Sequence, residues 1–338
     1  MHRAVGVMVC LLGMSQGTGA PSLGTTTLVG AGGTFPVPLY TRWFAEYEKI
    51  HPSWQMRYVA VGSGEGVHQV TTGGVDFGGT DSPMTDREIV EARVKVLHFP
   101  AALGAAVPAY NLPDLDKPLN FTGHILAGIF LGTIQKWNDP AIAAINPEAT
   151  LPAAHIAVVH RLEASGTTYV WTDYLSKVDA RWRHQIGRDT EVKWPKGVGF
   201  RGNGGVVEAV KRTPNSIGYC ELAYALQSGL PYGLVRNAGG NFILASPESI
   251  TAAADSLRMT RGDFRVSITN PAGRDAYPIA SFTWLLVPAN MESNKKPVMQ
   301  EFLRWMLTSG QAFSEPLGYA RLPEAAIRME LQAVERIQ

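Results

Sequence analysis

The chain has 338 residues, of which 45% are hydrophobic, so it can bury a large core, and its length suggests two lobes. Its 30 basic and 29 acidic side chains leave a formal net charge of +1, which argues against a nucleic-acid partner or an anionic membrane surface. Any anion specificity must therefore be local.

Residues 1–20 predict a cleavable secretory signal peptide. Arg3 is followed by the apolar run 4–14 and then by small residues up to Ala20. The run is too short to span a bilayer, and a flexible stretch follows it, which disfavours a buried first helix. A lipid anchor at Cys10 would leave almost no apolar segment in front of it. We expect cleavage near Ala20 and an exported mature protein.

Strand-like and helix-like segments alternate after the signal peptide, which predicts an α/β fold. Short β-branched or apolar runs predict strands at residues 28–30, 57–61, 155–159 and 281–287. Residues 36–50 have aromatic side chains at helical spacing. They predict a helix whose buried face is formed by Tyr40, Trp43, Phe44 and Tyr47. No later segment is apolar enough to cross a membrane.

Three turns of small residues each connect a strand-like run to a helical pattern. They are residues 30–35, 62–64 and 165–168, and Arg161 precedes the third. Backbone N–H groups and the dipole at the start of a helix favour a tetrahedral oxyanion, and hydroxyl groups add directed donors. Each turn alone is more commonly a helix cap or a tight turn. The three together, with an arginine, favour an anion site.

These turns do not match other common nucleotide-binding or catalytic motifs. Phe35 stands where a dinucleotide-binding turn needs its third glycine, and no P-loop lysine follows any of the turns. Neither Ser63 nor Ser165 has the Gly-x-Ser-x-Gly spacing of a hydrolase nucleophile, and no His-Glu-x-x-His motif occurs. The eight histidines are scattered, and His155 and His160 belong to no metal-ligand pattern. We expect no metal, no cofactor and no catalytic residue.

Cys220 would be the only cysteine of the mature chain, because cleavage removes Cys10. No internal disulfide could then form. The apolar, strand-like surroundings of Cys220 predict a buried thiol that packs as a small hydrophobe.

Two stretches that contain Gly and Pro lie between apolar runs and could be crossings between lobes, residues 99–108 and 273–278. If both are crossings, both ends of the mature chain belong to one lobe. Lobe I would then comprise residues 25–102 and 278–338, and lobe II residues 103–277.

A series of short motifs runs along nearly the whole chain after the signal peptide. They include Gly30-Ala31-Gly32-Gly33-Thr34-Phe35-Pro36, Asp76-Phe77-Gly78-Gly79-Thr80-Asp81, Lys136-Trp137-Asn138-Asp139, Arg161 with Ser165-Gly166-Thr167, Gly202-Asn203-Gly204-Gly205-Val206 and Ile217-Gly218-Tyr219. In residues and order they resemble the PstS family, the phosphate-binding proteins of the Pst ABC transporter. Because many motifs match in order, the resemblance is specific.

The resemblance implies a two-lobed periplasmic binding protein fold of type II, with hinge strands and a ligand cleft between the lobes. It also implies a monomeric periplasmic protein that captures inorganic phosphate and delivers it to the permease subunits of an ABC transporter, without catalysis or nucleic acid. Carried over by motif, the phosphate ligands are Thr34, Phe35, Ser63, Asp81, Arg161, Ser165, Gly166 and Thr167.

Three positions depart from the family pattern. Glu163 stands where the family usually has an Asp that holds the arginine through an ion pair, and its longer side chain could still reach. Ala164 replaces a Gly before Ser-Gly-Thr, and Gly64 replaces a second Ser after Ser63. These departures bear on affinity more than on the identity of the ligand.

The chemistry of Arg161 and Asp81 suits phosphate. A guanidinium offers a planar fork of donors that matches two phosphate oxygens. Phosphate near neutral pH still carries a proton that an Asp81 carboxylate can accept, whereas sulfate would present a lone pair to it. We expect this carboxylate to stay ionised beside Arg161. Without the family resemblance, Asp81 could simply begin a turn.

Two other functions stay open on the sequence alone. A phosphotransferase or phosphatase would use Asp81 or Ser165 as the nucleophile with Arg161 as support, but the sequence shows no activating base or metal cluster. A binding protein could instead take another oxyanion such as sulfate.

Overall fold

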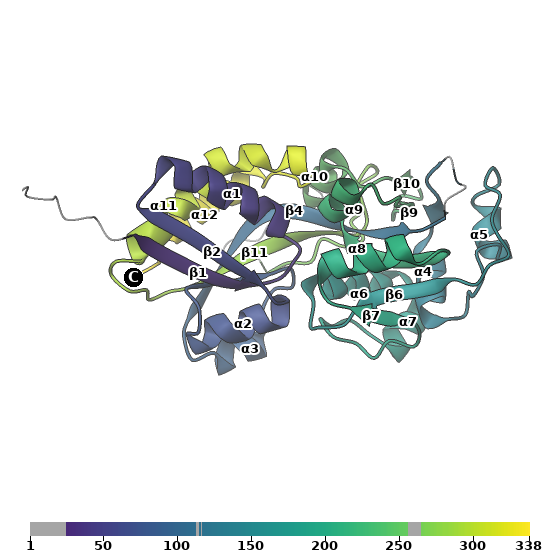
Figure 1. The fold of residues 1–338 in the computed structure, drawn as a ribbon, viewed down its shortest axis with the longest axis horizontal. Helices are drawn as coiled ribbons and strands as arrows, with labels where there is room; N and C mark the ends of the chain where they lie inside the picture. Colours follow the sequence, from purple (N-terminus) through teal and green to yellow (C-terminus); the bar gives the residue numbers. More distant parts are fainter. Residues whose placement is uncertain (1–24, 113–114, 116, 256–264) are drawn as a thin grey trace, which may run out of the picture.

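The computed structural model describes residues 25–112, 115, 117–255 and 265–338, which form two α/β lobes side by side (Figure 1). The predicted two-lobed α/β fold is thereby confirmed. The predicted signal peptide, residues 1–20, lies outside the described residues. In the described part of the chain, no helix is long and apolar enough to cross a bilayer.

Lobe I contains elements from both ends of the described chain. They are β1 (Thr26–Gly32), α1 (Val37–Ile50), β2 (Trp54–Ala60), α2 (Ser63–Thr72), β3 (Phe77–Thr80), α3 (Asp86–Glu91), the first part of β4 (Val96–Tyr110), β11 (Ala280–Pro288), α11 (Lys296–Leu307), the 3-10 turns η1 (Ser309–Phe313) and η2 (Glu315–Leu317), and α12 (Glu324–Val334). Helices α1, α11 and α12 lie on one side of these strands, and α2 and α3 lie on the other (Figure 1).

Lobe II contains the middle of the chain. Its elements are β5 (Asn120–Phe121), α4 (Gly123–Leu131), α5 (Pro140–Ala144), β6 (Ala157–Arg161), α6 (Gly166–Val178), α7 (Ala180–Gln185), β7 (Val198–Phe200), α8 (Gly202–Arg212), β8 (Ser216–Glu221), α9 (Leu222–Ser228), β9 (Leu234–Arg236), β10 (Phe242–Ile243) and α10 (Pro247–Asp255). Strands β10, β9 and β5 form a small separate sheet.

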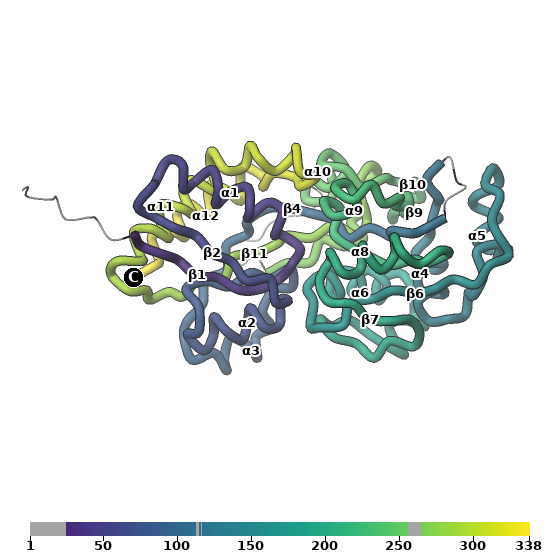
Figure 2. The backbone as a smooth tube through the Cα atoms, viewed as in Figure 1, coloured from purple at the N-terminus to yellow at the C-terminus, as the bar shows by residue number. Residues whose placement is uncertain are grey.

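A single eight-stranded sheet runs through both lobes, in the order β2-β1-β3-β11-β4-β8-β6-β7. The long strand β4 joins the two halves, and the backbone trace shows it passing from one lobe into the other (Figure 2). Its residues 96–105 pair with β11, and its residues 106–110 pair with β8. From Phe99 onward every residue of β4 is buried, as expected for a strand covered on both faces.

The strands predicted at residues 28–30, 57–61 and 281–287 correspond to β1, β2 and β11. Helix α1 buries Tyr40, Trp43, Phe44 and Tyr47, and this confirms the predicted aromatic face. The strand predicted at 155–159 is displaced, because His155 makes only an isolated bridge to Lys136 and β6 begins at Ala157. Strand β6 then ends at Arg161, the arginine that is predicted to bind the anion.

Cys220 lies in β8 and is fully buried. Burial raises the pKa of its thiol, so the group stays protonated at neutral pH. The prediction of a buried cysteine that packs as a small hydrophobe is confirmed.

Candidate functional site

The predicted turns meet where the two lobes face each other. A cleft of about 1100 Å³ lies between the lobes, and its lining includes Thr34 and Gly64 of lobe I and Glu163, Ala164 and Tyr224 of lobe II. Turns after β1, β2 and β6 lead into helices α1, α2 and α6. Ligands of open α/β sheets bind beyond the carboxyl ends of their strands, and these turns lie there.

In lobe I, three separate segments converge on one point. Gly33 follows β1, Ser63 begins α2, and Asp81 follows β3. A Cβ atom built on Gly33 would lie 2.9 Å from Ser63 Oγ and 3.0 Å from Asp81 Oδ2. The hydroxyl of Tyr58 donates to the carbonyl oxygen of Gly33 at 2.9 Å and holds this turn in place. Only glycine leaves room for so close an approach.

The carboxyl group of Asp81 is only 1% exposed and is held by hydroxyl donors. Thr283 donates to its Oδ1 at 2.9 Å, and Ser63 donates to its Oδ2 at 3.5 Å. Burial raises the pKa of Asp81 to about 7, although these hydrogen bonds and the charge of Arg161 oppose the shift. The expectation that Asp81 stays ionised across neutral pH is therefore wrong, because burial outweighs its favourable partners.

In lobe II, Arg161 at the end of β6 is 3% exposed and is oriented by two neighbours. Its Nε and Nη2 atoms both donate to Glu163 Oε1, the former at 3.1 Å. Its Nη1 atom donates to Thr167 Oγ1 at 3.2 Å. The longer side chain of Glu163 thus does reach the arginine.

Glu163 is itself held as an anion. Burial would raise its pKa, but the charge and hydrogen bonds of Arg161 outweigh burial, and the pKa is lowered. The backbone N–H of Gly202 also donates to Glu163 Oε1, at 3.0 Å. The guanidinium is therefore held in place by side chains of the protein itself.

Helix α6 begins at the predicted Ser-Gly-Thr turn. Ser165 is its N-cap, and Ser165 Oγ accepts from the backbone N–H of Thr168 at 3.3 Å. The N–H groups of Gly166 and Thr167 precede the first hydrogen bond of the helix, so the helix leaves them available as donors. A Cβ atom on Gly166 would collide with Ser63 and Asp81 of lobe I. The start of α6 therefore lies directly against the acceptor of the other lobe.

Several contacts join the lobes around these residues. Asn203 donates from its backbone N–H and from Nδ2 to Thr34 Oγ1, at 3.1 and 2.9 Å. Tyr224 donates to the carbonyl oxygen of Thr34 at 2.7 Å. Within lobe I, the carbonyl oxygen of the buried Phe35 accepts from the Tyr319 hydroxyl at 2.6 Å. The eight predicted ligands and Glu163 thus form one connected group, although their role as phosphate ligands stays a prediction.

Gly64 and Ala164, two of the residues that depart from the family pattern, face each other across the lobes. The N–H of Gly64 donates to the carbonyl oxygen of Ala164 at 3.2 Å. A Cβ atom on Gly64 would lie 2.6 Å from the Ala164 Cβ. The two departures therefore compensate, because an alanine at 164 needs a glycine at 64.

Sequence reasoning missed several residues that shape the site, namely Tyr58, Asn203, Tyr219, Tyr224 and Thr283. Asn203 and Tyr219 lie in motifs that the sequence did single out. Tyr58, Tyr224 and Thr283 belong to none of these motifs, and only the folded structure brings them to the site.

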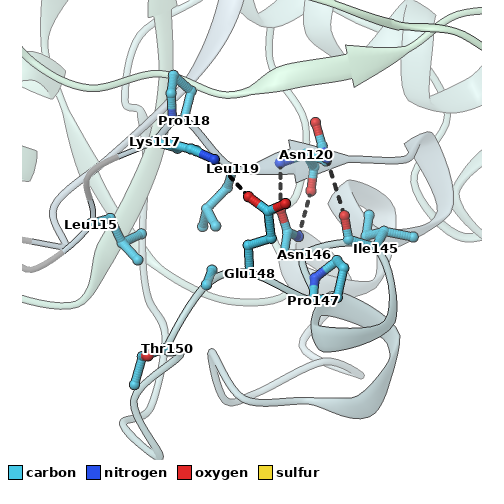
Figure 3. A pocket seen from close by; sticks show the side chains of 11 residues that line it. Leu115, Lys117, Pro118, Leu119, Asn120, Ile145, Asn146, Pro147, Glu148 and Thr150 are labelled. Carbon is cyan, nitrogen blue, oxygen red and sulfur yellow. Dashed lines mark hydrogen bonds and ion pairs between the residues drawn. The ribbon is translucent and has the colours of Figure 1, made fainter.

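A second pocket, of about 490 Å³, lies in lobe II beside β5 and α5 (Figure 3). Its polar groups largely pair with one another. Lys117 pairs with Glu148 at 2.6 Å, and the backbone N–H of Asn120 donates to Asn146 Oδ1 at 2.8 Å. Among the described residues, no group of three or more His, Cys, Asp or Glu side chains could hold a metal ion.

Comparison with known proteins identifies the family. Residues 17–309 match the model of the PBP superfamily domain. The phosphate-binding protein PstS of Xylella fastidiosa is 39% identical over 302 residues, which cover 88% of this chain and 82% of that protein. The PstS of Pasteurella multocida is 39% identical over 321 residues, which cover 94% and 92%. The chain belongs to the PstS family.

The fold agrees with this membership. The crystal structure of a phosphate-binding protein from Stenotrophomonas maltophilia superposes with a TM-score of 0.70, at 17% identity, covering 91% of this chain and 94% of that one. The two proteins therefore share a fold over most of the length of both chains.

Proposed function

We propose that this chain is an extracytoplasmic solute-binding protein that captures inorganic phosphate and delivers it to the permease of an ABC transporter. Membership of the PstS family supports the proposal, since the relatives named above are phosphate-binding proteins. The observation that carries it for this chain is the placement of a buried arginine of one lobe and a buried carboxyl group of the other around the start of helix α6.

The proposed ligand set is the predicted one. Arg161 binds two phosphate oxygens with its fork, and the N–H groups of Phe35, Gly166 and Thr167 add backbone donors. The hydroxyls of Thr34, Ser63, Ser165 and Thr167 add further donors. Asp81 is the one acceptor and takes a hydrogen bond from a phosphate hydroxyl. Such a site needs a tetrahedral anion that carries a proton, which is the property that separates phosphate from sulfate.

Delivery requires that the two lobes open and close about the crossings. We propose that lobe I comprises residues 25–102 and 278–338, that lobe II comprises residues 103–277, and that phosphate stabilises their contact. The filled, closed form is then the one that the permease recognises. We also propose a periplasmic monomer produced by cleavage of residues 1–20.

A phosphatase is the less supported alternative. Ser165 Oγ caps α6, and Asp81 is held by Thr283 and Ser63. A hydrolase would need an activating base or a metal beside one of these groups. A chromogenic phosphate ester that stays uncleaved by the purified protein would agree with a binding role.

Calorimetric titration with inorganic phosphate tests the proposal, with sulfate and molybdate as competitors. We expect one phosphate per chain, displacement by sulfate only at far higher concentration, and a smaller radius of gyration by small-angle scattering when phosphate is saturating. Equal binding of sulfate, or no binding of phosphate, would refute the proposed specificity. An unchanged radius of gyration would argue against closure.

A further inference from the structure

Asn203 lies deep between the lobes, in a motif to which the proposed function assigns no role. It is the second residue of α8 and is 0% exposed. Its side chain contacts one proposed phosphate ligand from each lobe.

The orientation of its amide group is fixed by a backbone partner. The N–H of Glu221, which can only donate, lies 2.9 Å from Asn203 Oδ1. The amide nitrogen must therefore face the other way. There Nδ2 lies 2.9 Å from Thr34 Oγ1 and 3.2 Å from Thr167 Oγ1, so it donates one hydrogen to each hydroxyl.

Each of these hydroxyls accepts a second hydrogen bond. Thr34 Oγ1 accepts from the backbone N–H of Asn203 at 3.1 Å, and Thr167 Oγ1 accepts from Arg161 Nη1 at 3.2 Å. A hydroxyl has two acceptor lone pairs and one hydrogen. With both lone pairs occupied, each threonine can offer a ligand only its hydrogen.

We infer that Asn203 is a positioning residue for specificity, which forces the hydroxyls of Thr34 and Thr167 to act as donors toward the bound anion. The inference rests on the proposed function. Two donor-only hydroxyls favour phosphate oxygens without hydrogen and would face a phosphate O–H unfavourably. The proton of the ligand is thereby directed to Asp81, so that phosphate has one preferred orientation in the site.

Replacing Asn203 tests this role through the pH profile of binding. In Asn203→Ala the hydroxyls can rotate, so we expect phosphate affinity to fall about tenfold near pH 8.5, where one phosphate hydrogen remains. Near pH 6 the ligand carries more hydrogen, which the freed hydroxyls can accept, and the loss should shrink to roughly threefold or less. A loss of the same factor at both pH values would indicate a merely structural role and overturn the inference.

Asn203→Asp keeps the shape and reverses the hydrogen bonds, because a carboxylate accepts from both hydroxyls. It should lose more affinity than the alanine variant near pH 8.5 and recover as the pH falls. The matched control is Asn146→Asp, the same change at a buried asparagine in the pocket of Figure 3, away from the cleft. This control should keep wild-type affinity at both pH values.

A double-mutant cycle supplies a readout that does not depend on pH. If Asn203 acts through the hydroxyls, Asn203→Ala should have little further effect on phosphate affinity in a Thr34→Val, Thr167→Val background. Additive losses would overturn the inference. Failure of wild-type protein to bind phosphate would instead refute the proposed function, so the two failures are distinguishable. Melting temperatures of each variant show whether it is folded.

Discussion

The two lobes contribute opposite chemistry to the same small volume. Lobe II presents the guanidinium of Arg161, which is paired with Glu163, and the N–H groups at the start of α6, whereas lobe I adds the carboxyl group of Asp81. Attraction for an anion is thus concentrated at Arg161 and discrimination between anions at Asp81. Changes at Arg161 should therefore alter mainly affinity, and changes at Asp81 should alter mainly selectivity.

The largest effect is expected at Arg161. An ammonium group cannot reproduce a fork that binds Glu163, Thr167 and two ligand oxygens together. Arg161→Lys should weaken phosphate binding by on the order of 100-fold or more, as measured by calorimetry. The control is Glu163→Gln, which leaves the fork intact and should lose less. Affinity near wild type for the lysine variant would show that Arg161 is peripheral.

Selectivity should change most at Asp81. Asp81→Asn keeps the shape, and its amide can rotate to donate to a sulfate oxygen or accept from a phosphate hydroxyl. Phosphate affinity should change little, while the preference for phosphate over sulfate should fall by roughly 10- to 100-fold. Competition titrations measure the ratio. If it stays at the wild-type value, the carboxyl group is not the filter.

A third prediction concerns the contact between Gly64 and Ala164. Gly64→Ser places a Cβ atom against the Ala164 methyl group and should hinder closure, lowering phosphate affinity about tenfold. Adding Ala164→Gly removes the methyl group and should restore most of the affinity. Scattering at saturating phosphate should show the single variant less compact than the double variant. Independent, additive losses would contradict the compensation.

A fourth prediction concerns stability without ligand. Asp81 has an ordinary pKa of 3.8 and a folded pKa of about 7. Between these values the folded protein binds a proton that the unfolded chain has lost, so the free energy of unfolding falls as the pH rises through this window. The side chain of Asp81→Asn does not titrate, so the variant does not lose free energy of unfolding in this way. Its melting temperature should therefore exceed that of wild type by more at pH 8 than at pH 5. An equal gain at both values would mean that Asp81 is ionised when folded.

Most of the hydrogen-bond donors of the site could be predicted from the sequence. The turns before α2 and α6 combine strand-like runs with Gly, Ser and Thr, and Arg161 and Glu163 are near neighbours in the chain. The raised pKa of Asp81 could not, because it depends on burial by segments that are distant in the chain, and the opposing hydrogen bond comes from Thr283, about 200 residues away. The hydrogen bonds of Asn203 were equally hidden, since Thr34 is 169 residues away.

The change of partner along β4 has a further consequence for how the chain is assembled. Ala105 of β4 pairs with Ala280 of β11, and the N–H of Ala106 donates to the carbonyl oxygen of Ile279 at 3.0 Å. The chain thus leaves one half of the protein and re-enters it at adjacent, antiparallel positions, where a tight hairpin turn would fit. Lobe II is thus an insertion between two strands of lobe I that pair with each other, β4 and β11. It could be exchanged as a unit without changing the order of strands in the host.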